Sequence, residues 1–226
     1  MSIFRKFNVK LQFRNRIYGG LPKSKELVKN YVEAKFGSED ASIVETDLDL
    51  EEEEEKVRTG FKRCPARDAL YIGDYAVKAM MKQCISLLKL TVQLRGSKQT
   101  LREGTAVKGL VGDKLTEEKV FFQPFRPKED GIEDFAGHVQ TMQGMRSILK
   151  SAEYLIKPTL EFQIWCLGVR MEGTKDVNPD HLQDILELGQ EVGLGSQRSF
   201  EKGKFDVVEF SEIDPPVKKK KKGAKK

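Results

Sequence analysis

Alternating apolar and polar positions predict a strand at the start of the chain. Over residues 6–14 apolar side chains occupy every second position, and they are Phe7, Val9, Leu11 and Phe13. This period of two gives the strand one apolar face and one basic-polar face. A turn follows at Tyr18-Gly19-Gly20, and Ser24 is placed to cap a helix that runs to about Phe36 before Gly37 ends it.

Two apolar stripes at helical spacing predict helices in the middle of the chain. The first helix runs from about Asp74 to Val92, and its stripe consists of Val77, Met80, Met81, Cys84, Ile85 and Leu88. Its lysines fall together on another face, and they are Lys78, Lys82 and Lys89. The second helix runs from about Met142 to Lys157, and its inward residues are Met145, Ile148, Leu149, Ala152 and Ile156.

The last part of the chain predicts a strand–helix–strand unit from Thr159 to Phe210. Its first strand alternates apolar and polar positions, its helix begins at Asn178-Pro179 and ends near Val192, and its second strand begins at Lys204. Earlier in the chain, residues 95–131 are rich in glycine and charge. They predict irregular loops and hairpins, with one strand from Lys119 to Phe125.

This order of elements predicts an α+β fold of the ferredoxin-like or RNA-recognition-motif (RRM) type. We expect an antiparallel sheet with helices on one face and irregular β insertions. We also expect a single domain over residues 1–214, with an acidic loop at about residues 45–56. Residues 215–226 are expected to form a disordered basic tail.

The net charge depends on two segments of opposite sign. The tail from Lys218 to Lys226 carries seven lysines, and without it the formal charge changes from +5 to −2. The block from Glu45 to Glu55 carries eight acids, and setting it aside as well leaves the remainder at +6. The tail either attracts polyanions without specificity or serves only solubility. The acidic block is either a solvated loop or a competitor for the basic surface.

Cysteine usage and hydropathy indicate a reducing, aqueous compartment. The three cysteines (Cys64, Cys84 and Cys166) are widely spaced and form no metal-binding pattern, so we expect buried apolar thiols. No apolar run reaches the roughly 18 residues that a membrane helix needs. The N-terminus, Met1 to Arg5, lacks the apolar core of a signal peptide. We therefore expect a cytoplasmic protein with no membrane partner.

A glycine-rich segment before the last predicted strand is the strongest candidate for chemistry. The sequence GLGSQRSFEKG contains Gly193, Gly195 and Gly203 together with the basic residues Arg198 and Lys202. Glycine permits positive φ and a close backbone approach, so the loop N–H groups and the two basic side chains could hold a phosphodiester. The segment also has the composition of a tight helix-to-strand connection that binds nothing.

Two segments carry a resemblance to a known family. Residues 71–82 read YIGDYAVKAMMK and resemble the segment Y-I-P-G-S-S-L-K-G-A-L-R that enters the first helix of the RAMP superfamily, the repeat-associated proteins of CRISPR systems. Gly73, Asp74 and Ala79 depart from that pattern. The glycine-rich segment resembles the superfamily's C-terminal loop G-x-G-x-x-R-x-x-G-x-G-x-F, from which Phe200-Glu201-Lys202 departs. Gln190 to Ser199 also resembles the ending G-Q-x-V-G-L-G-x-x-R-S of short phage-encoded RAMP-like proteins.

The resemblance implies a ferredoxin-like domain that binds single-stranded nucleic acid, usually RNA. Some members of the superfamily stack side by side along a strand, and others cut RNA. In that fold the loop packs near the first helix, so its basic residues approach the helix lysines, whose alternative role is a solvated face. Arg14 and Arg16 are expected to add phosphate contacts, and Tyr18 one stacked base. The candidate nucleic-acid-binding residues are Arg14, Arg16, Tyr18, Lys78, Lys82, Gly193, Gly195, Arg198, Ser199 and Lys202.

The sequence offers no set of catalytic residues and no metal site. Metal-free RNA cleavage needs a general base and acid, usually histidine, and the only candidates are His138 and His181. Neither lies in a catalytic motif, and His181 is expected to face solvent from the first turn of a helix. Metal-dependent cleavage needs clustered carboxylates on ordered elements, whereas the clustered acids here form the low-complexity run. We expect neither catalytic residues nor a cofactor.

Two classes of function follow from these observations. The leading hypothesis is a non-catalytic protein that binds single-stranded RNA or DNA and forms a homo-oligomer along the strand, in the cytoplasm of a bacterial host cell. The alternative is a structural protein that self-assembles or binds a protein partner without nucleic acid. A histidine-dependent endoribonuclease is the third and weakest hypothesis.

Overall fold

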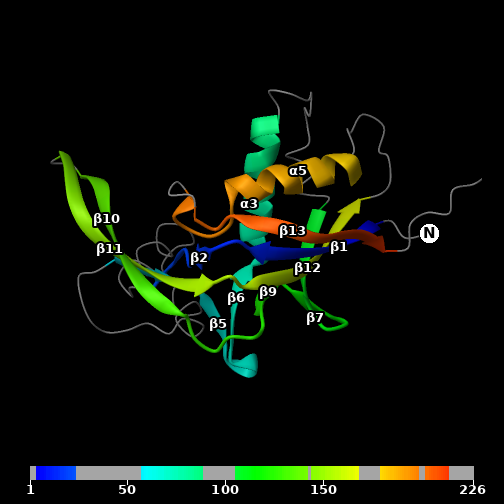
Figure 1. Cartoon of the computed structure of the whole chain (residues 1–226), viewed down its shortest axis with the longest axis horizontal. Helices are drawn as coiled ribbons and strands as arrows, with labels where there is room; N and C mark the ends of the chain where they lie inside the picture. The colour runs from blue at the N-terminus through cyan, green and yellow to red at the C-terminus, as the bar shows by residue number, and fades with distance from the viewer. Residues whose placement is uncertain are drawn as a thin grey trace, which may run out of the picture.

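The structure is a computed structural model that describes residues 4–23, 57–88, 105–141, 144–167, 179–198 and 202–213. The helix predicted from Ser24 to Phe36, the acidic loop and the basic tail lie outside these residues. The described part has an α+β fold with two helices and mostly antiparallel sheets, which confirms the predicted fold class (Figure 1).

The first strand is an inner strand of the larger sheet, next to its edge strand. β1 (Phe4–Phe13) lies between β12 (Thr159–Leu167) and β13 (Phe205–Ile213) and is antiparallel to both. β12 and β13 therefore run parallel to each other, with α5 (Pro179–Val192) between them in sequence. This arrangement confirms the predicted strand–helix–strand unit. The alternating apolar side chains of β1 are buried on one face of the sheet, and they are Phe7, Val9, Leu11 and Phe13.

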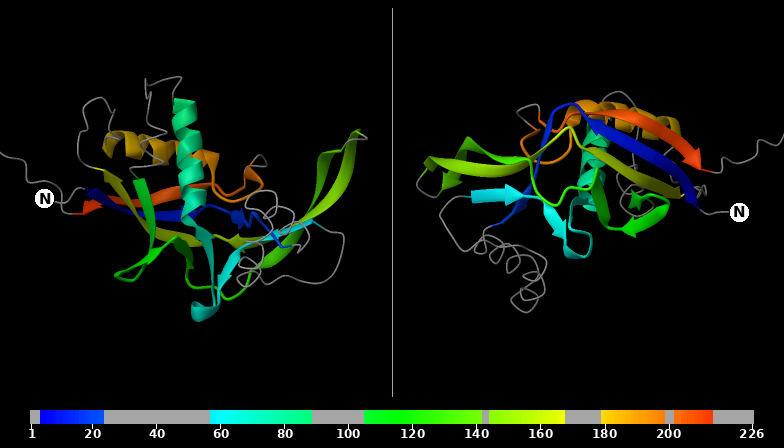
Figure 2. Two further views of the ribbon diagram at one scale, coloured as in Figure 1. Left: turned by 180° about the vertical axis from the view of Figure 1, so that it is seen from behind. Right: turned by 60° about the horizontal axis from the view of Figure 1, so that its bottom comes forward.

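Two helices cover this apolar face. α3 (Asp74–Leu88) packs against α5, and Figure 2 shows the two helices crossing on one side of the sheet. The apolar stripe predicted for α3 is buried in one core with the apolar residues of α5, β1 and β12. The buried helix residues are Val77, Met80, Met81, Cys84, Ile85, Leu182, Ile185 and Leu186. Burial of apolar surface contributes about 25 cal/mol of favourable free energy per Å², and it is the main force that holds the helices on the sheet.

The far edge of the larger sheet contains the region predicted to be irregular. β12 pairs first with β9 (Lys119–Gln123) and then with β7 (Thr105–Val111), which forms a hairpin with β8 (Lys114–Glu117). β9 confirms the strand predicted from Lys119. The sheet continues through β6 (Ala69–Gly73) and β5 (Lys62–Cys64), which are joined by the short helix η2 (Pro65–Arg67).

The helix predicted from Met142 to Lys157 is wrong. That segment is β11 (Gly144–Ile156), which forms a long hairpin with β10 (Gly131–Thr141) that projects from the rest of the fold (Figure 1). Three consecutive residues of β11, Ser151, Ala152 and Glu153, are buried, so both faces of the strand are covered here. Burial on both faces removes the alternation that marks a strand, whereas Ile156, expected inward, is exposed.

A buried carboxylate joins neighbouring strands of the second sheet, which contains β10 and β11. Glu153 of β11 is only 1% exposed, and it accepts hydrogen bonds from the Phe61 N–H at 3.0 Å and from Arg58 at 3.3 Å. Lys23 forms an ion pair with it at 2.8 Å. These contacts join β11 to β3 (Leu21–Pro22) and β4 (Val57–Gly60), while β2 (Arg16–Tyr18) pairs with the end of β11. The Ser196 hydroxyl donates to the Gly19 carbonyl at 2.7 Å and holds the Gly19-Gly20 turn next to the glycine-rich loop.

Candidate nucleic-acid interface

The glycine-rich loop needs glycine at three positions. Gly193, Gly195 and Gly203 have φ values of 76°, 85° and 74°, a left-handed region that L side chains rarely adopt. A Cβ on Gly195 would lie 2.5 Å from the Tyr18 carbonyl oxygen, and one on Gly203 would overlap the Leu194 carbonyl group. The loop therefore depends on backbone approaches that no other residue allows.

Hydrogen bonds fasten this loop to β2 and close it on itself. The Ser196 N–H donates to the Tyr18 carbonyl at 2.9 Å, and the Gly203 N–H donates to the Arg16 carbonyl at 3.0 Å. The Leu194 N–H donates to the Gly203 carbonyl at 2.9 Å. Because these three N–H groups already have protein acceptors, they are not available to the backbone phosphate cradle that the sequence suggested. The side chains that the loop presents remain as candidate binding groups.

The two basic residues of the loop point to different neighbours. Arg198 is exposed and reaches α3, where its Nη1 donates to the Gln83 Oε1 at 2.8 Å. This contact places the loop against α3, as the family resemblance implied. Lys202 lies on the other side, where its charge helps to lower the pKa of Glu133. Ser199, also predicted to bind nucleic acid, lies outside the described residues.

The lysines of α3 differ in their surroundings. Lys78 forms an ion pair with Asp74 at 2.7 Å, so its charge is balanced within the helix. Lys82 is half-buried and forms no ion pair within the described parts of the chain. Tyr75, Ala79 and Lys82 are spaced by four and three residues, so they share one face of the helix. Tyr75 and Ala79 line a cleft beside that face.

This open cleft, with a volume of about 210 Å³, lies between the glycine-rich loop and the start of α3. Its lining combines backbone, aromatic and basic groups from the loop, the Gly19-Gly20 turn, the segment around β5, and α3. The side chains that give it chemical character are those of Lys62, Tyr71, Tyr75 and Arg198. The cleft thus brings cations and an aromatic ring together at one opening.

Sequence reasoning missed Lys62 and Tyr75. Tyr75 is 56% exposed, and the Lys62 ammonium lies 5.9 Å from its ring centroid. A signal for Tyr75 was present, because this large aromatic residue falls outside the apolar stripe of the predicted helix. Lys62 had no such signal, since its approach to the helix depends on the antiparallel pairing of β5 with β6.

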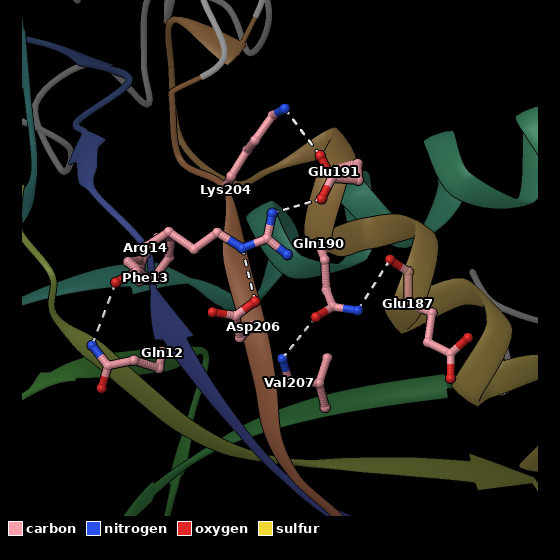
Figure 3. Close-up of polar contacts among 9 residues, drawn as sticks. All are labelled: Gln12, Phe13, Arg14, Glu187, Gln190, Glu191, Lys204, Asp206 and Val207. Atoms are coloured by element: carbon pink, nitrogen blue, oxygen red, sulfur yellow. Dashed lines mark hydrogen bonds and ion pairs between the residues drawn. The ribbon is translucent and has the colours of Figure 1, made fainter.

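Arg14 is held by carboxylates rather than presented to a ligand. Its guanidinium contacts Glu191 at 2.6 Å and Asp206 at 2.7 Å, and Lys204 contacts the same Glu191 at 3.0 Å (Figure 3). These hydrogen bonds raise the pKa of Arg14 and lower the pKa of Glu191. Arg14 therefore fastens β1 to α5 and β13, and its charge is balanced where a phosphate contact was predicted.

Arg16 and Tyr18 share one acidic partner on the projecting hairpin. The Arg16 Nη1 lies 2.6 Å from Glu133 and its guanidinium lies over the Tyr154 ring, while the Tyr18 hydroxyl donates to Glu133. The hydrogen bond from Tyr18 is the main cause that lowers the pKa of Glu133, and burial raises the pKa of Tyr18. The Tyr18 ring is fully buried, next to Phe135 and Tyr154, so it has no exposed face on which a base could stack in this structure.

Outside the cleft, the described groups of chemical interest are His181 and the three cysteines. His181, expected to face solvent, is half-buried, and its Nδ1 has no hydrogen-bond partner in the described segments. The three cysteines are buried and free, as predicted. Within the described ranges, no three potential ligands form a metal site. No described helix has the length and apolar character needed to cross a membrane.

Comparison with known proteins identifies the fold. No family model matches the chain, and no curated protein matches its sequence. Its fold is similar to that of a chain in the cryo-electron microscopy structure of the type III-B Cmr-β complex bound to cognate target RNA. The TM-score is 0.52 and the sequence identity is 13%. The match covers 93% of this chain and 61% of that chain, so this chain spans less than two thirds of its structural neighbour.

Proposed function

We propose that this protein is a non-catalytic, RAMP-like protein that binds single-stranded RNA or DNA. The observation that carries this proposal is the cleft where Arg198 and Lys62 meet the exposed ring of Tyr75. Cations neutralise a phosphodiester backbone and aromatic rings stack on unpaired bases, so their combination suits a single strand. The RNA-bound complex that contains the structural neighbour supports the same class of ligand.

The contacts of the basic side chains indicate which of them are available to bind phosphate. Arg14, Arg16 and Lys78 each contact a carboxylate at 2.6–2.7 Å. Arg198 instead contacts the neutral Gln83, and Lys82 forms no ion pair with a described residue. A phosphate that binds Arg198 or Lys82 need not displace a carboxylate. The proposed backbone-binding residues are therefore Arg198, Lys82 and Lys62.

A charge-removal experiment tests this assignment. The variant Arg198→Ala/Lys82→Ala removes one cation that lines the cleft and one on the face of α3 that Tyr75 and Ala79 share. The control Lys10→Ala/Lys114→Ala removes two cations elsewhere, one paired with Glu161 and one in the β7–β8 hairpin. Loss of two phosphate contacts should reduce the salt slope of single-strand binding by about 1.4. The control pair should leave the slope within error, and equal slopes for both double variants would refute the site.

Two further parts of the proposal have separate tests. Side-by-side assembly along a strand predicts light-scattering masses that grow with the length of the nucleic acid, whereas a protein-assembly role predicts salt-insensitive association without it. The absence of catalysis predicts that bound RNA stays intact through long incubation. Cleavage that is lost in His138→Ala or in His181→Ala would instead establish the endoribonuclease hypothesis.

A further inference from the structure

Tyr75 is held in an exposed position at the cleft. Its ring is the most exposed aromatic side chain of the described residues, at 56%, compared with 45% for Phe125 and 38% for Phe4. It belongs to the first turn of α3, which is anchored in the core on its opposite face. Burial normally removes such a ring from water, so its presentation at an opening lined by cations suits a ligand with a flat apolar face.

The backbone beside Tyr75 is shaped to receive the ring. A Cβ added to Gly73 would overlap the Cδ1–Cε1 edge of Tyr75, so the ring rests directly against a residue without a side chain. The Lys62 ammonium lies near the same ring, 5.9 Å from its centroid. Contact with Gly73 and a neighbouring cation limit the positions of the ring before any ligand arrives. Less conformational entropy is then lost on binding.

We infer that Tyr75 is the stacking platform for one unpaired nucleobase, with Lys62 and Arg198 contacting the phosphates on either side of it. This inference rests on the proposed function and assigns its base-binding residue. Aromatic platforms tolerate every base because each base has a π-face, so the contact favours single strands over duplexes without selecting a sequence. It replaces the role that the sequence assigned to the buried Tyr18.

The open face of the larger sheet contains a rival aromatic residue. Trp165 has the Lys6 and Lys108 ammonium groups at 4.3 and 4.4 Å from its ring centroid, and its N–H donates to Gln163 at 2.8 Å. Both cations lie closer to this ring than the single Lys62 ammonium, at 5.9 Å, lies to Tyr75, and a hydrogen bond fixes the indole as well. Phe4 lies next to it, with 6.2 Å between the ring centroids. Phe4→Ala therefore serves as the matched control for loss of an exposed aromatic ring.

The experiment measures binding of the full-length protein to labelled single-stranded RNA and DNA. Tyr75→Ala should weaken binding by about 10- to 100-fold, because one stacked base is lost. Tyr75→Phe keeps the ring and should bind within about twofold of the wild type. Phe4→Ala should also bind like the wild type. Loss of affinity in Phe4→Ala but not in Tyr75→Ala would move the platform to the sheet face and overturn the inference.

Base-free oligonucleotides separate stacking from a structural effect. A strand of abasic sites offers phosphates but no base, so wild type and Tyr75→Ala should bind it with equal affinity. An equal loss on normal and abasic strands would show that Tyr75 only supports the fold. Gly73→Ala provides a second route, because it displaces the ring without deleting it and should weaken binding to normal strands only.

The outcome also separates this inference from the proposed function. If Arg198→Ala/Lys82→Ala weakens binding and Tyr75→Ala does not, the strand-binding site stands and the platform is wrong. If the wild type binds no single strand, both are wrong. A 2-aminopurine base in the strand should lose fluorescence on binding to the wild type and retain it with Tyr75→Ala.

Discussion

Gly203 is the position where the glycine-rich loop is most sensitive to a single methyl group. Its φ of 74° is left-handed, and a Cβ would overlap the Leu194 carbonyl group. The left-handed region alone costs an alanine about 1–2 kcal/mol. Relief of the overlap would stretch the Leu194 N–H···O=C Gly203 and Gly203 N–H···O=C Arg16 hydrogen bonds, at about 0.5–1.5 kcal/mol each. We expect Gly203→Ala to lower the free energy of unfolding by about 2–5 kcal/mol.

Gly112 provides the matched control for this prediction. It lies in the turn of the β7–β8 hairpin with a φ of 57°, and a Cβ there would have no neighbour within 4 Å. Gly112→Ala therefore carries the backbone penalty of about 1–2 kcal/mol without the overlap. The smaller entropy of the unfolded alanine chain affects both variants equally. Urea denaturation with matched m values measures the difference. Equal destabilisation of the two variants would refute the close packing of the loop.

Three further predictions concern the core and the ion pairs. Glu153→Ala removes the buried carboxylate that Lys23, Arg58 and the Phe61 N–H contact and should cost about 3–5 kcal/mol in urea denaturation. A cost below about 1 kcal/mol would contradict the network. The pKa values of Glu133 and Glu212 are lowered in the folded protein. The contribution of these two carboxylates to the stability of the fold is therefore present above about pH 4.3 and is lost as the pH falls further. Unfolding curves that do not shift between about pH 5 and 3 would contradict this. Burial raises the pKa of Cys84 and of Cys166 to about 11, so both thiols should react with a thiol reagent only after unfolding, and rapid labelling of the native protein would show that they are accessible.

Local periodicity predicted the elements that have one buried face. β1 and α3 each bury a single stripe, so their periods of two and of 3.6 residues are visible in the sequence. β11 lacked this signal because it buries Ser151, Ala152 and Glu153 in succession, on both of its faces. Its conformation depends on partners far away in the chain, which no local pattern reveals.

At the candidate site, too, the contacts between residues far apart in sequence were the part that the sequence did not predict. The family resemblance predicted that the glycine-rich loop would meet α3, and Arg198 does reach Gln83. It did not predict that Arg14 and Arg16 would be paired, since their partners Glu191 and Glu133 lie more than 100 residues away in sequence. A composition-based count of cations therefore overestimates the charge that is available to a ligand.

The central claim is tested most directly by measuring single-strand binding with the full chain and with a chain that ends at residue 214. Fluorescence anisotropy with labelled single-stranded RNA, single-stranded DNA and duplex DNA at two salt concentrations is sufficient. We expect both chains to bind single strands in preference to duplex, and we expect Arg198→Ala/Lys82→Ala to weaken the binding of both equally. Binding that disappears with residues 215–226, or that the double variant leaves unchanged, would contradict the central claim.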